Sequence, residues 1–262
     1  MKLLRKRRVS APGCDDAPVV EIECGTHARN VTFVIPYYEN PLMLARQVQS
    51  WVGYREDLRN HLSVIVIDDG SPDTPAADVL RGKLLPFDLR LFRIGVDVRW
   101  NWLAARNLGM FHARDWCLLT DMDHQVPQGT LETLIYGKVE PFTVYRFKRV
   151  ESIGFQTWAD IPPHPNSWFM TQNSFWQIGG YDEALSGHYG TDGEYRRRVA
   201  KTLPVRIMTD ALVRHEFELD ASTTRYKRKQ PEDRAVQAMV SSRGPDWRPK
   251  VLSFPWQQQI LS

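Results

Sequence analysis

Two acidic turns in this sequence each follow directly on a short apolar run. Asp121 and Asp123 come after the run 116–120, and Asp69 comes after the run 62–67. Side chains two residues apart in extended backbone point the same way, so Asp121 and Asp123 could both reach one Mg²⁺ or Mn²⁺. Such ions also take phosphate oxygens, so the pair predicts a site for a metal and a phosphate. The alternative is an acidic turn that binds nothing.

The turn at Asp69 also has two interpretations. In the first, the turn is an Asx turn that caps the following helix near Asp73 or Thr74. In the second, a carboxylate accepts a hydrogen bond from a nucleobase or a ribose hydroxyl. The aromatic face for such a base would come from Tyr37 or Tyr38, which follow the first apolar run. A place for that tyrosine in the core is the equally open alternative.

A third acidic position, Asp192, lies in a glycine-rich stretch that leads into a charged helix. A carboxylate at a helix N-terminus is stabilised by the helix dipole, so a capping role is one explanation. A carboxylate that stays ionised in a cleft could also act as a general base.

The elements that carry these residues alternate regularly. Apolar runs at 31–36, 62–67, 89–94 and 116–120 predict strands, and helical patterns follow at 44–51 and 104–114. This alternation predicts an α/β fold with a mostly parallel sheet and right-handed crossovers. Ligands of such sheets bind at the carboxyl ends of the strands, where the strand order reverses, and both acidic turns fall at such ends. After about residue 140 the pattern changes to shorter strands, at 143–149 and 205–208. We expect this second half of the chain to form the side of the cleft that binds the second substrate, the acceptor.

Composition and charge exclude several classes of protein. The chain has 262 residues, of which 42% are hydrophobic and 25% charged, which excludes disorder, collagen-like repeats and small disulfide scaffolds. The formal net charge of +3 is too small to require a nucleic-acid partner. Basic residues cluster at 2–8 and at 225–229. We expect both clusters to be solvated surface, and binding of anionic lipid or of an acidic acceptor is the minor alternative.

Cysteine usage and hydropathy bear on location. The three cysteines form no CxxC pair, which favours a reducing compartment. No apolar segment follows the basic N-terminus, and no run approaches the roughly 20 apolar residues of a membrane span. We therefore expect a cytoplasmic protein without a transmembrane segment, with peripheral membrane contact left open.

Six motifs, taken together and in order, resemble the family 2 glycosyltransferases of the GT-A fold. The motifs are Val34–Tyr38, Ile67–Ser71, Ala105–Gly109, Leu119–Asp123, Ile178–Glu183 and Gly190–Tyr195. The resemblance covers roughly residues 31–215. It implies a GT-A domain at 30–220, with a nucleotide-sugar half at 30–125 and an acceptor half at 126–220. We expect a basic N-terminal tail or extension at 1–29 and a C-terminal extension at 221–262.

The resemblance also implies roles for particular residues. The implied donor-binding residues are Pro36, Tyr38, Glu39, Asp69, Arg106, Asn107 and Asp121. The implied ligands of a Mn²⁺ or Mg²⁺ cofactor are Asp121, Asp123 and His215, with His124 as a weaker competitor of His215. Asp192 matches the acid that serves as catalytic base in inverting members. Family habit favours a UDP-sugar as the donor.

Aromatic residues in the second half predict the acceptor side. The chain has nine tryptophans, and aromatic faces stack well on sugar rings or bases, although most tryptophans belong to cores. We expect a glycan or another hydroxyl acceptor to contact Trp168, Trp176 and Tyr189. Contacts from His164, Trp158, Phe169, Asn173 and His188 are weaker expectations for the same side.

Two departures from the family pattern bear on the predicted base and on the predicted mode of transfer. Thr191 stands where members usually carry Glu, so the base assignment depends on Asp192 alone. No Gln-x-x-Arg-Trp motif of processive synthases occurs, which favours single transfers.

A nucleotidyltransferase would need a glycine-rich loop after the first strand, and residues 36–41 contain no glycine. A non-catalytic carbohydrate- or nucleotide-binding protein stays open, as does modified DNA as the acceptor, which the basic cluster at 225–229 permits.

Overall fold

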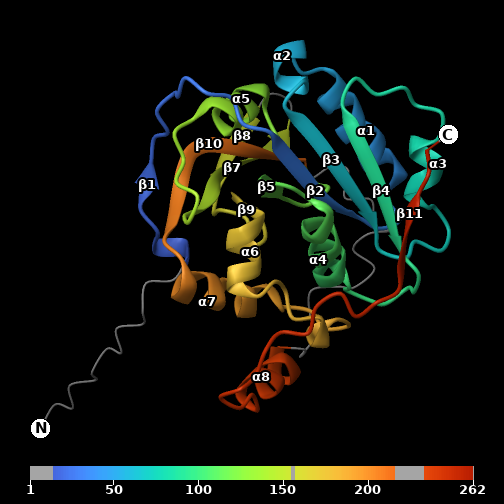
Figure 1. The fold of residues 1–262 in the computed structure, drawn as a ribbon, viewed down its shortest axis with the longest axis vertical. Helices are drawn as coiled ribbons and strands as arrows, with labels where there is room; N and C mark the ends of the chain where they lie inside the picture. The colour runs from blue at the N-terminus through green and yellow to red at the C-terminus, as the bar shows by residue number, and fades with distance from the viewer. Residues whose placement is uncertain (1–13, 155–156, 216–232, 262) are drawn as a thin grey trace, which may run out of the picture.

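A computed structural model describes residues 14–154, 157–215 and 233–261 (Figure 1). Its centre is a sheet of eleven strands. Nine of them follow one another across the sheet in the order β1 (Val19–Val20), β10 (Val205–His215), β7 (Val144–Gly154), β9 (Trp168–Thr171), β5 (Trp116–Leu119), β2 (Val31–Tyr37), β3 (Leu62–Asp68), β4 (Asp88–Ile94) and β11 (Trp256–Gln259). The other two are β6 (His124–Gln125), which pairs with β10, and β8 (Thr157–Ile161), which pairs with β7.

The strand order reverses in the middle of the sheet. Strands β2, β3 and β4 are parallel and run outward in chain order, whereas β5 returns to the other side of β2, also in parallel. The point of reversal therefore lies between β2 and β5, where a doubly wound sheet has its ligand crevice. The four strands expected from the first half of the sequence are confirmed as β2, β3, β4 and β5.

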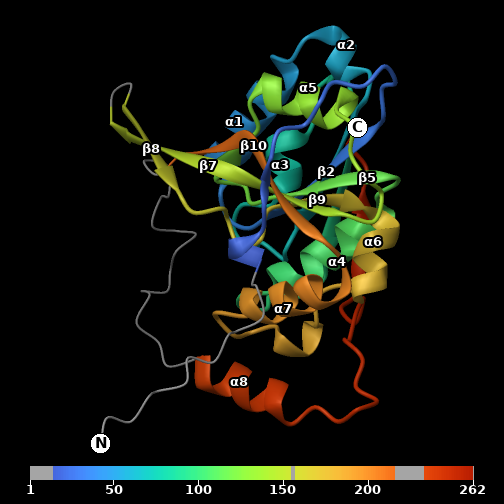
Figure 2. The same ribbon diagram turned by 90° about the vertical axis from the view of Figure 1, so that its left-hand side faces the viewer.

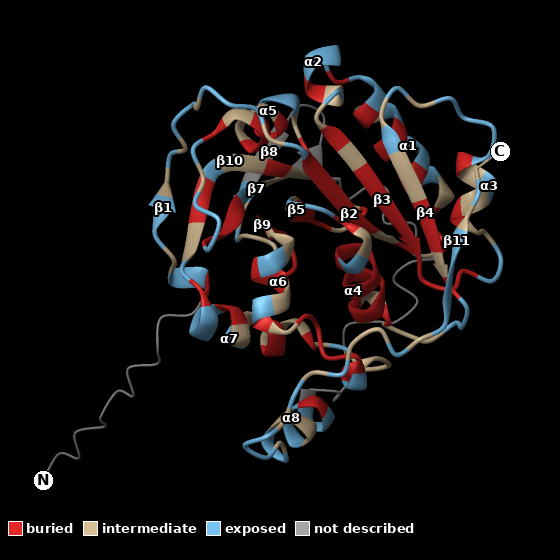
Figure 3. Ribbon diagram, viewed as in Figure 1, coloured by how far each residue is buried: buried red, intermediate tan, exposed pale blue. Residues whose placement is uncertain are grey.

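Helices cover both faces of this sheet (Figure 2). One face carries α4 (Trp102–His112), α6 (Gln172–Ile178) and α7 (Asp192–Thr202), whose apolar residues share one hydrophobic cluster. The other carries α1 (Pro41–Val52), α2 (Glu56–Arg59), α3 (Ala76–Leu80) and α5 (Gln128–Tyr136) in a second cluster. Because both faces are covered, β2 and β3 are continuous apolar runs that are buried along almost their whole length (Figure 3). No helix in the described part of the chain is long and apolar enough to cross a membrane.

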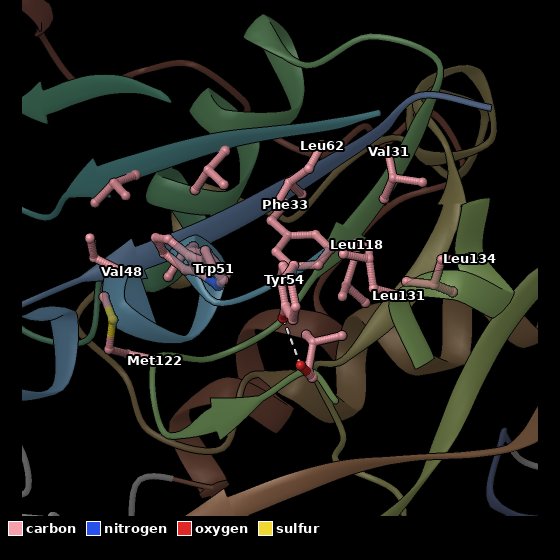
Figure 4. Close-up of a cluster of buried hydrophobic side chains, with 14 of the residues drawn as sticks. Val31, Phe33, Val48, Trp51, Tyr54, Leu62, Leu118, Met122, Leu131 and Leu134 are labelled. Carbon is pink, nitrogen blue, oxygen red and sulfur yellow. Dashed lines mark hydrogen bonds between the residues drawn. The ribbon is translucent and has the colours of Figure 1, made fainter. Parts of the chain in front are cut away.

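Figure 4 shows the cluster beneath α1 and α5. Phe33, Leu62 and Leu118 project into it from three neighbouring strands, and Trp51 closes it from α1. Within it, the hydroxyl of Tyr54 donates to the carbonyl of Val126 at 2.6 Å, drawn as a dashed line. This bond satisfies the hydroxyl where water is excluded.

The close packing of α4 on the sheet depends on Gly109. A Cβ atom at this position would lie 2.3 Å from Cγ1 of Val34 and 2.7 Å from Cδ1 of Ile67. We therefore expect Gly109→Val to lower the free energy of unfolding by about 1–3 kcal/mol, the usual cost of overpacking a core. Gly129→Val in α5 is the matched control, because nothing lies within 4 Å of a Cβ there. Urea denaturation of both variants checks this, and equal stabilities would contradict it.

Segments expected to lie outside the central domain contribute to the sheet and its cover. From the N-terminal segment, β1 pairs in parallel with β10, and the short 3₁₀ helix η1 (Cys14–Asp16) precedes it. From the C-terminal segment, α8 (Asp233–Ser241) precedes the strand β11, which pairs antiparallel with the edge of β4. The two basic clusters of the sequence lie outside the described residues.

Glu183 holds this C-terminal segment to the domain. It opens the 3₁₀ helix η2 (Glu183–Leu185) and is buried. Its Oε1 accepts from the backbone N–H of Leu252 at 2.7 Å, and its Oε2 accepts from the backbone N–H and the hydroxyl of Ser253 at 2.7 and 2.6 Å. Neighbouring Asp182 accepts from the N–H of Lys250 at 3.0 Å and is paired with Arg243.

Candidate active site

The acidic turn after β3 divides its two carboxylates between two tasks. Asp68 accepts from the backbone N–H groups of Ser71 and Ala76, both at 2.8 Å, so it makes the Asx turn and supports the start of α3. Gly70 has a φ of +77°, and a Cβ there would lie 2.3 Å from the carbonyl oxygen of Val96. The capping role that the sequence left open therefore belongs to Asp68, which leaves Asp69 for another purpose.

Asp69 is buried without enough hydrogen bonds for a carboxylate. Its Oδ1 has no partner among the described residues. Burial raises the pKa of the Asp69 carboxyl well above its ordinary value, and the Asn101 side chain only partly offsets this effect. Asn101 is itself buried and neither amide atom has a well-formed hydrogen bond in the described part of the molecule. Such a site is suited to a ligand that brings its own N–H donor.

Asp69 therefore costs stability, and replacing it should make the protein more stable. A raised pKa means that the folded state holds the proton more tightly, so stability falls as pH rises above 3.8, the ordinary value. At pH 7 we expect Asp69→Asn to raise the free energy of unfolding by about 1–3 kcal/mol, the usual cost of a buried unsatisfied polar group. Thermal unfolding from pH 4 to 8 checks this, with exposed Asp73→Asn as the control. If the difference in stability between Asp69→Asn and the wild type did not grow as pH rises, the raised pKa of Asp69 would be contradicted.

The residues at the end of β2 and in the loop after it differ in how far they are buried. Tyr37 is buried, and its hydroxyl donates to the carbonyl of Thr74 at 2.5 Å, so the core role applies to this tyrosine. Tyr38 is half-buried, and its hydroxyl donates to Oδ1 of Asp97 at 3.1 Å. Pro36 is also half-buried, at the end of β2. Tyr38 is thus the aromatic side chain that this loop places between the ends of β2 and β4.

Glu39, expected at the donor, is engaged within the protein. It is buried with a φ of 47°, and its Oε1 accepts from the backbone N–H groups of Asp73 and Thr74 at 3.0 and 3.1 Å. Its Oε2 accepts from the hydroxyl of Thr74 at 2.8 Å. The carboxylate therefore holds the turn at Asp73 and Thr74.

The acid pair after β5 is surrounded by basic groups. Arg106 is fully buried and forms an ion pair with Oδ1 of Asp121 through its Nη2. Its Nη1 donates to the carbonyl of Asn166, and its guanidinium lies 5.1 Å from the Trp102 ring centre. Arg106, which the resemblance places at the donor, thus links α4 to the acid that follows β5.

Two histidines complete the surroundings of this pair. Nε2 of His164 lies 3.2 Å from Oδ2 of Asp121, and Nδ1 of His124 lies 2.6 Å from Oδ1 of Asp123. The two rings pack at 4.5 Å between centres. Burial lowers the pKa of His164 to about 3, although Asp121 acts in the opposite direction. Sequence reasoning placed His164 on the acceptor side, and no spacing links it to Asp121 because the two residues come from separate strand ends.

A divalent ion would find carboxylates here but no complete cage. Among the described side chains, no group of three His, Cys, Asp or Glu residues is arranged to hold a metal ion. The backbone of His215 ends β10, and its side chain lies outside the described part of the structure. Mg²⁺ and similar ions commonly bind one or two carboxylates and take phosphate oxygens and water as the other ligands. Asp121 and Asp123 fit this mode.

Asn107, expected to border the donor, points to the neighbouring turn. Its amide donates to the carbonyl of Tyr181 and to Oε1 of Glu183, both at 2.8 Å, and its Oδ1 accepts from the N–H of Tyr181 at 2.8 Å. All these contacts are structural. In this structure the Asn107 side chain fixes the 180–183 turn against α4.

Asp192 is the first residue of α7 and is half-exposed. Its carboxylate makes no hydrogen bond or ion pair with any described residue. The loop before it carries Tyr189, which is 42% exposed and packs on Trp100 with 5.1 Å between ring centres. Trp100 has a φ of 54°, a conformation that costs energy for a bulky residue. The loops at 97–101 and 186–191 therefore meet, and the first of them also carries Asp97, the partner of Tyr38.

The two tryptophans expected at the acceptor lie elsewhere. Trp168 has no exposed surface: it is on β9, opposite Leu119 of β5, and packs on Tyr195 in the core. This placement is a correction, because a fully buried ring presents no face to a sugar. Trp176 is half-buried on α6, packed edge-on against Phe175. Tyr189 is the one of the three aromatic residues that packs on the 97–101 loop.

Comparisons with known proteins agree with this arrangement. The family model described as glycosyl transferase family 2 matches residues 32–203. Similar solved structures include residues 1–349 of TarS from S. aureus, with 14% identity over 71% of this chain and 60% of that chain and a TM-score of 0.53. The mannosyltransferase PcManGT from Pyrobaculum calidifontis, in complex with GDP-Man and Mn²⁺, has 15% identity over 84% of this chain and 71% of that one, with a TM-score of 0.55.

A third similar structure is GalNAc-T7 with UDP, GalNAc and Mn²⁺. It has 15% identity over 72% of this chain and 44% of its own, with a TM-score of 0.55. The chain thus spans well under two thirds of both TarS 1–349 and GalNAc-T7. Comparison with curated protein sequences gave no match. At these identities the structural neighbours establish a shared GT-A fold.

Proposed function

Since the chain belongs to glycosyl transferase family 2, we propose that it transfers a sugar from a nucleotide-sugar donor, a UDP-sugar, to an acceptor hydroxyl. The proposed transfer depends on a divalent metal, inverts the anomeric configuration and occurs once per acceptor. One observation carries the proposal: Tyr38, Asp69 and the Asp121–Asp123 pair follow β2, β3 and β5, three adjacent parallel strands at the point where the strand order reverses.

The donor's nucleoside would lie across the ends of β2 and β3. The unpartnered Oδ1 of Asp69 would accept from an N–H of the base, which would satisfy a buried carboxylate that no described residue satisfies. Tyr38 would offer its ring face to the base. Asp121, held by Arg106 and His164, would accept from a ribose hydroxyl.

The diphosphate would lie toward Asp123. When bound there with Asp121 and the phosphates, Mn²⁺ or Mg²⁺ supplies positive charge to the departing nucleoside diphosphate. His124 fixes the Asp123 carboxylate from the protein side at 2.6 Å. The complexes of GalNAc-T7 with UDP and Mn²⁺ and of PcManGT with GDP-Man and Mn²⁺ support this class of donor and metal.

Asp192 would act as the general base. Its place in the first turn of α7 puts the carboxylate at the positive end of the helix dipole. It would take the proton from the acceptor hydroxyl as that oxygen bonds to the anomeric carbon, while the bond from that carbon to the diphosphate oxygen breaks on the opposite face. Tyr189 and Trp100 offer an aromatic surface for the acceptor, which we propose to be a glycan or another molecule with a free hydroxyl.

Thermal unfolding with UDP, GDP, CDP, ADP or dTDP, each with and without Mn²⁺, tests the proposal. A nucleotide at about 100 times its Kd stabilises the folded state by about 2.7 kcal/mol, which moves the midpoint by several degrees. We expect UDP to give a shift that requires Mn²⁺. A shift with another nucleotide would correct the donor, and no shift with any of the five would favour a non-catalytic domain instead.

A further inference from the structure

The loop that carries His164 is held firmly over the end of β5. Arg146, which is fully buried, donates from Nη2 to the carbonyls of Pro163 and His164 at 3.1 and 3.2 Å. At the far end of the loop, the hydroxyls of Thr120 and Ser167 are 2.9 Å apart. His164 therefore stands on a buried, hydrogen-bonded platform next to the acid pair.

The hydrogen bonds of His164 determine which ring nitrogen carries the proton. The backbone N–H of Asn166 points at Nδ1 from 3.3 Å, and an N–H can only donate, so Nδ1 is an acceptor without a proton. The proton of the neutral ring is then on Nε2, which lies 3.2 Å from Oδ2 of Asp121. His164 thus donates a hydrogen bond to the carboxylate.

His124 has the opposite arrangement. Its Nε2 lies 3.3 Å from Nη1 of Arg149, a group that only donates, and its Nδ1 lies 2.6 Å from Oδ1 of Asp123. The two neighbouring histidines therefore have opposite tautomers, and each donates to one acid of the pair. Neither ring turns a lone pair toward the carboxylate that it contacts.

Asp121 consequently has one donor on each oxygen among the described residues. Arg106 holds Oδ1 and His164 holds Oδ2, from different elements and different directions. A carboxylate oxygen accepts about two hydrogen bonds, so each oxygen keeps one acceptor position in a fixed direction. Without His164, the carboxylate would be held by Arg106 alone and could turn about its χ angles.

We propose that His164 is a positioning residue that fixes the Asp121 carboxylate for the hydroxyls of the donor's ribose. This inference rests on the proposed function, because it takes Asp121 as the ribose acceptor. The histidine acts through Asp121 and contacts no reacting atom. Its removal should weaken the binding of ribose-containing nucleotides and leave the fold in place.

Two variants separate positioning from packing. His164→Leu keeps a side chain of similar bulk but removes the donor, and His164→Gln places an amide nitrogen near the position of Nε2. We expect the Kd of UDP with Mn²⁺, measured by calorimetry, to rise about tenfold in His164→Leu and less than threefold in His164→Gln. His61→Gln is the control, since His61 lies just before β3, at the opposite end of that strand, and its ring hydrogen-bonds Asn30 alone among the described residues.

A UDP analogue without the ribose hydroxyls provides the decisive readout. With 2′,3′-dideoxy-UDP, we expect the wild type and His164→Leu to bind equally, because the contact that His164 supports is missing from the ligand. An equal loss of affinity for UDP and for the analogue would show a general structural effect and overturn the inference. Unchanged UDP binding in His164→Leu would overturn it as well.

The tautomer can be measured without a nucleotide. In ¹⁵N spectra of the ring, we expect His164 to show a protonated Nε2 and an unprotonated Nδ1, and a protonated Nδ1 would contradict the inference. If wild-type protein binds no UDP, the proposed donor is wrong and this spectrum alone decides whether His164 donates to Asp121. Failure of the function and failure of the inference are therefore distinguishable.

Discussion

Asp192→Asn should abolish transfer while leaving donor binding intact. The substitution keeps the shape of the side chain but removes its ability to take a proton, and a general base typically contributes about 10²–10⁴-fold to a rate. We expect turnover with an acceptor to fall by about 10³-fold and the Mn²⁺-dependent Kd of the nucleotide to change less than twofold. Turnover is measured as release of nucleoside diphosphate, and binding by calorimetry on the same preparation.

The control for this variant must also remove a charge at a helix start. Asp78→Asn does so, because Asp78 lies in the first turn of α3 and is exposed. Loss of the interaction with the helix dipole costs both variants about 0.3–1 kcal/mol of stability, whereas only Asp192→Asn should lose activity. Transfer at the wild-type rate in Asp192→Asn would assign the base elsewhere, and weakened nucleotide binding would make Asp192 a donor residue.

Asp123→Asn should remove the metal dependence. Stabilisation of the leaving diphosphate by a bound ion supplies several kcal/mol, so we expect turnover to fall by about 10³-fold. The Mn²⁺-dependent part of the thermal shift with nucleotide should disappear, because an amide is a poorer ligand of a hard cation than a carboxylate. Paramagnetic resonance of Mn²⁺ in the presence of UDP measures the bound ion directly, without turnover.

Asp121→Asn is the informative comparison for this variant. Asp121 is the partner of the buried guanidinium of Arg106, so its loss leaves a buried charge without its counter-ion and should reduce stability strongly. Asp123 faces a histidine instead, so Asp123→Asn should unfold near the wild-type temperature. A large drop in its midpoint would show that the lost activity reflects unfolding. If Asp123→Asn still bound Mn²⁺, the ligands of the ion would have to be other residues.

The parts of this fold that the sequence predicted are those that local patterns determine. Strands β2 and β3 are runs of β-branched and apolar residues that end in polar turns, and this pattern needs no knowledge of their neighbours. The position of Asp69 follows from the same pattern. The sequence pattern could not show that Asp68 makes the turn while Oδ1 of Asp69 has no described partner. That division depends on which backbone N–H groups approach each carboxylate.

The parts that the sequence did not predict depend on contacts between distant segments. Asn107 matched a donor motif, yet its amide is used by the turn at Tyr181. His164 and Asp121 meet because β9, which follows the His164 loop, pairs antiparallel with β5. Trp168 carried a signal that was available: it begins the apolar run 168–170, which is typical of a buried strand and argues against a surface for sugars.

The hydrogen bonds of Glu183 join the region that matches the family to residues that lie beyond it. The region that matches the family ends at residue 203, but Leu252 and Ser253 satisfy the buried Glu183 carboxylate, and β11 covers the edge of β4. A chain cut after residue 203 would keep every proposed catalytic carboxylate and lose both of these. It would expose a bare strand edge, which favours aggregation, and a buried acid short of donors. The region that matches the family is therefore shorter than the sheet to which it belongs, which extends to Gln259, and we expect a stable fragment to need this C-terminal segment.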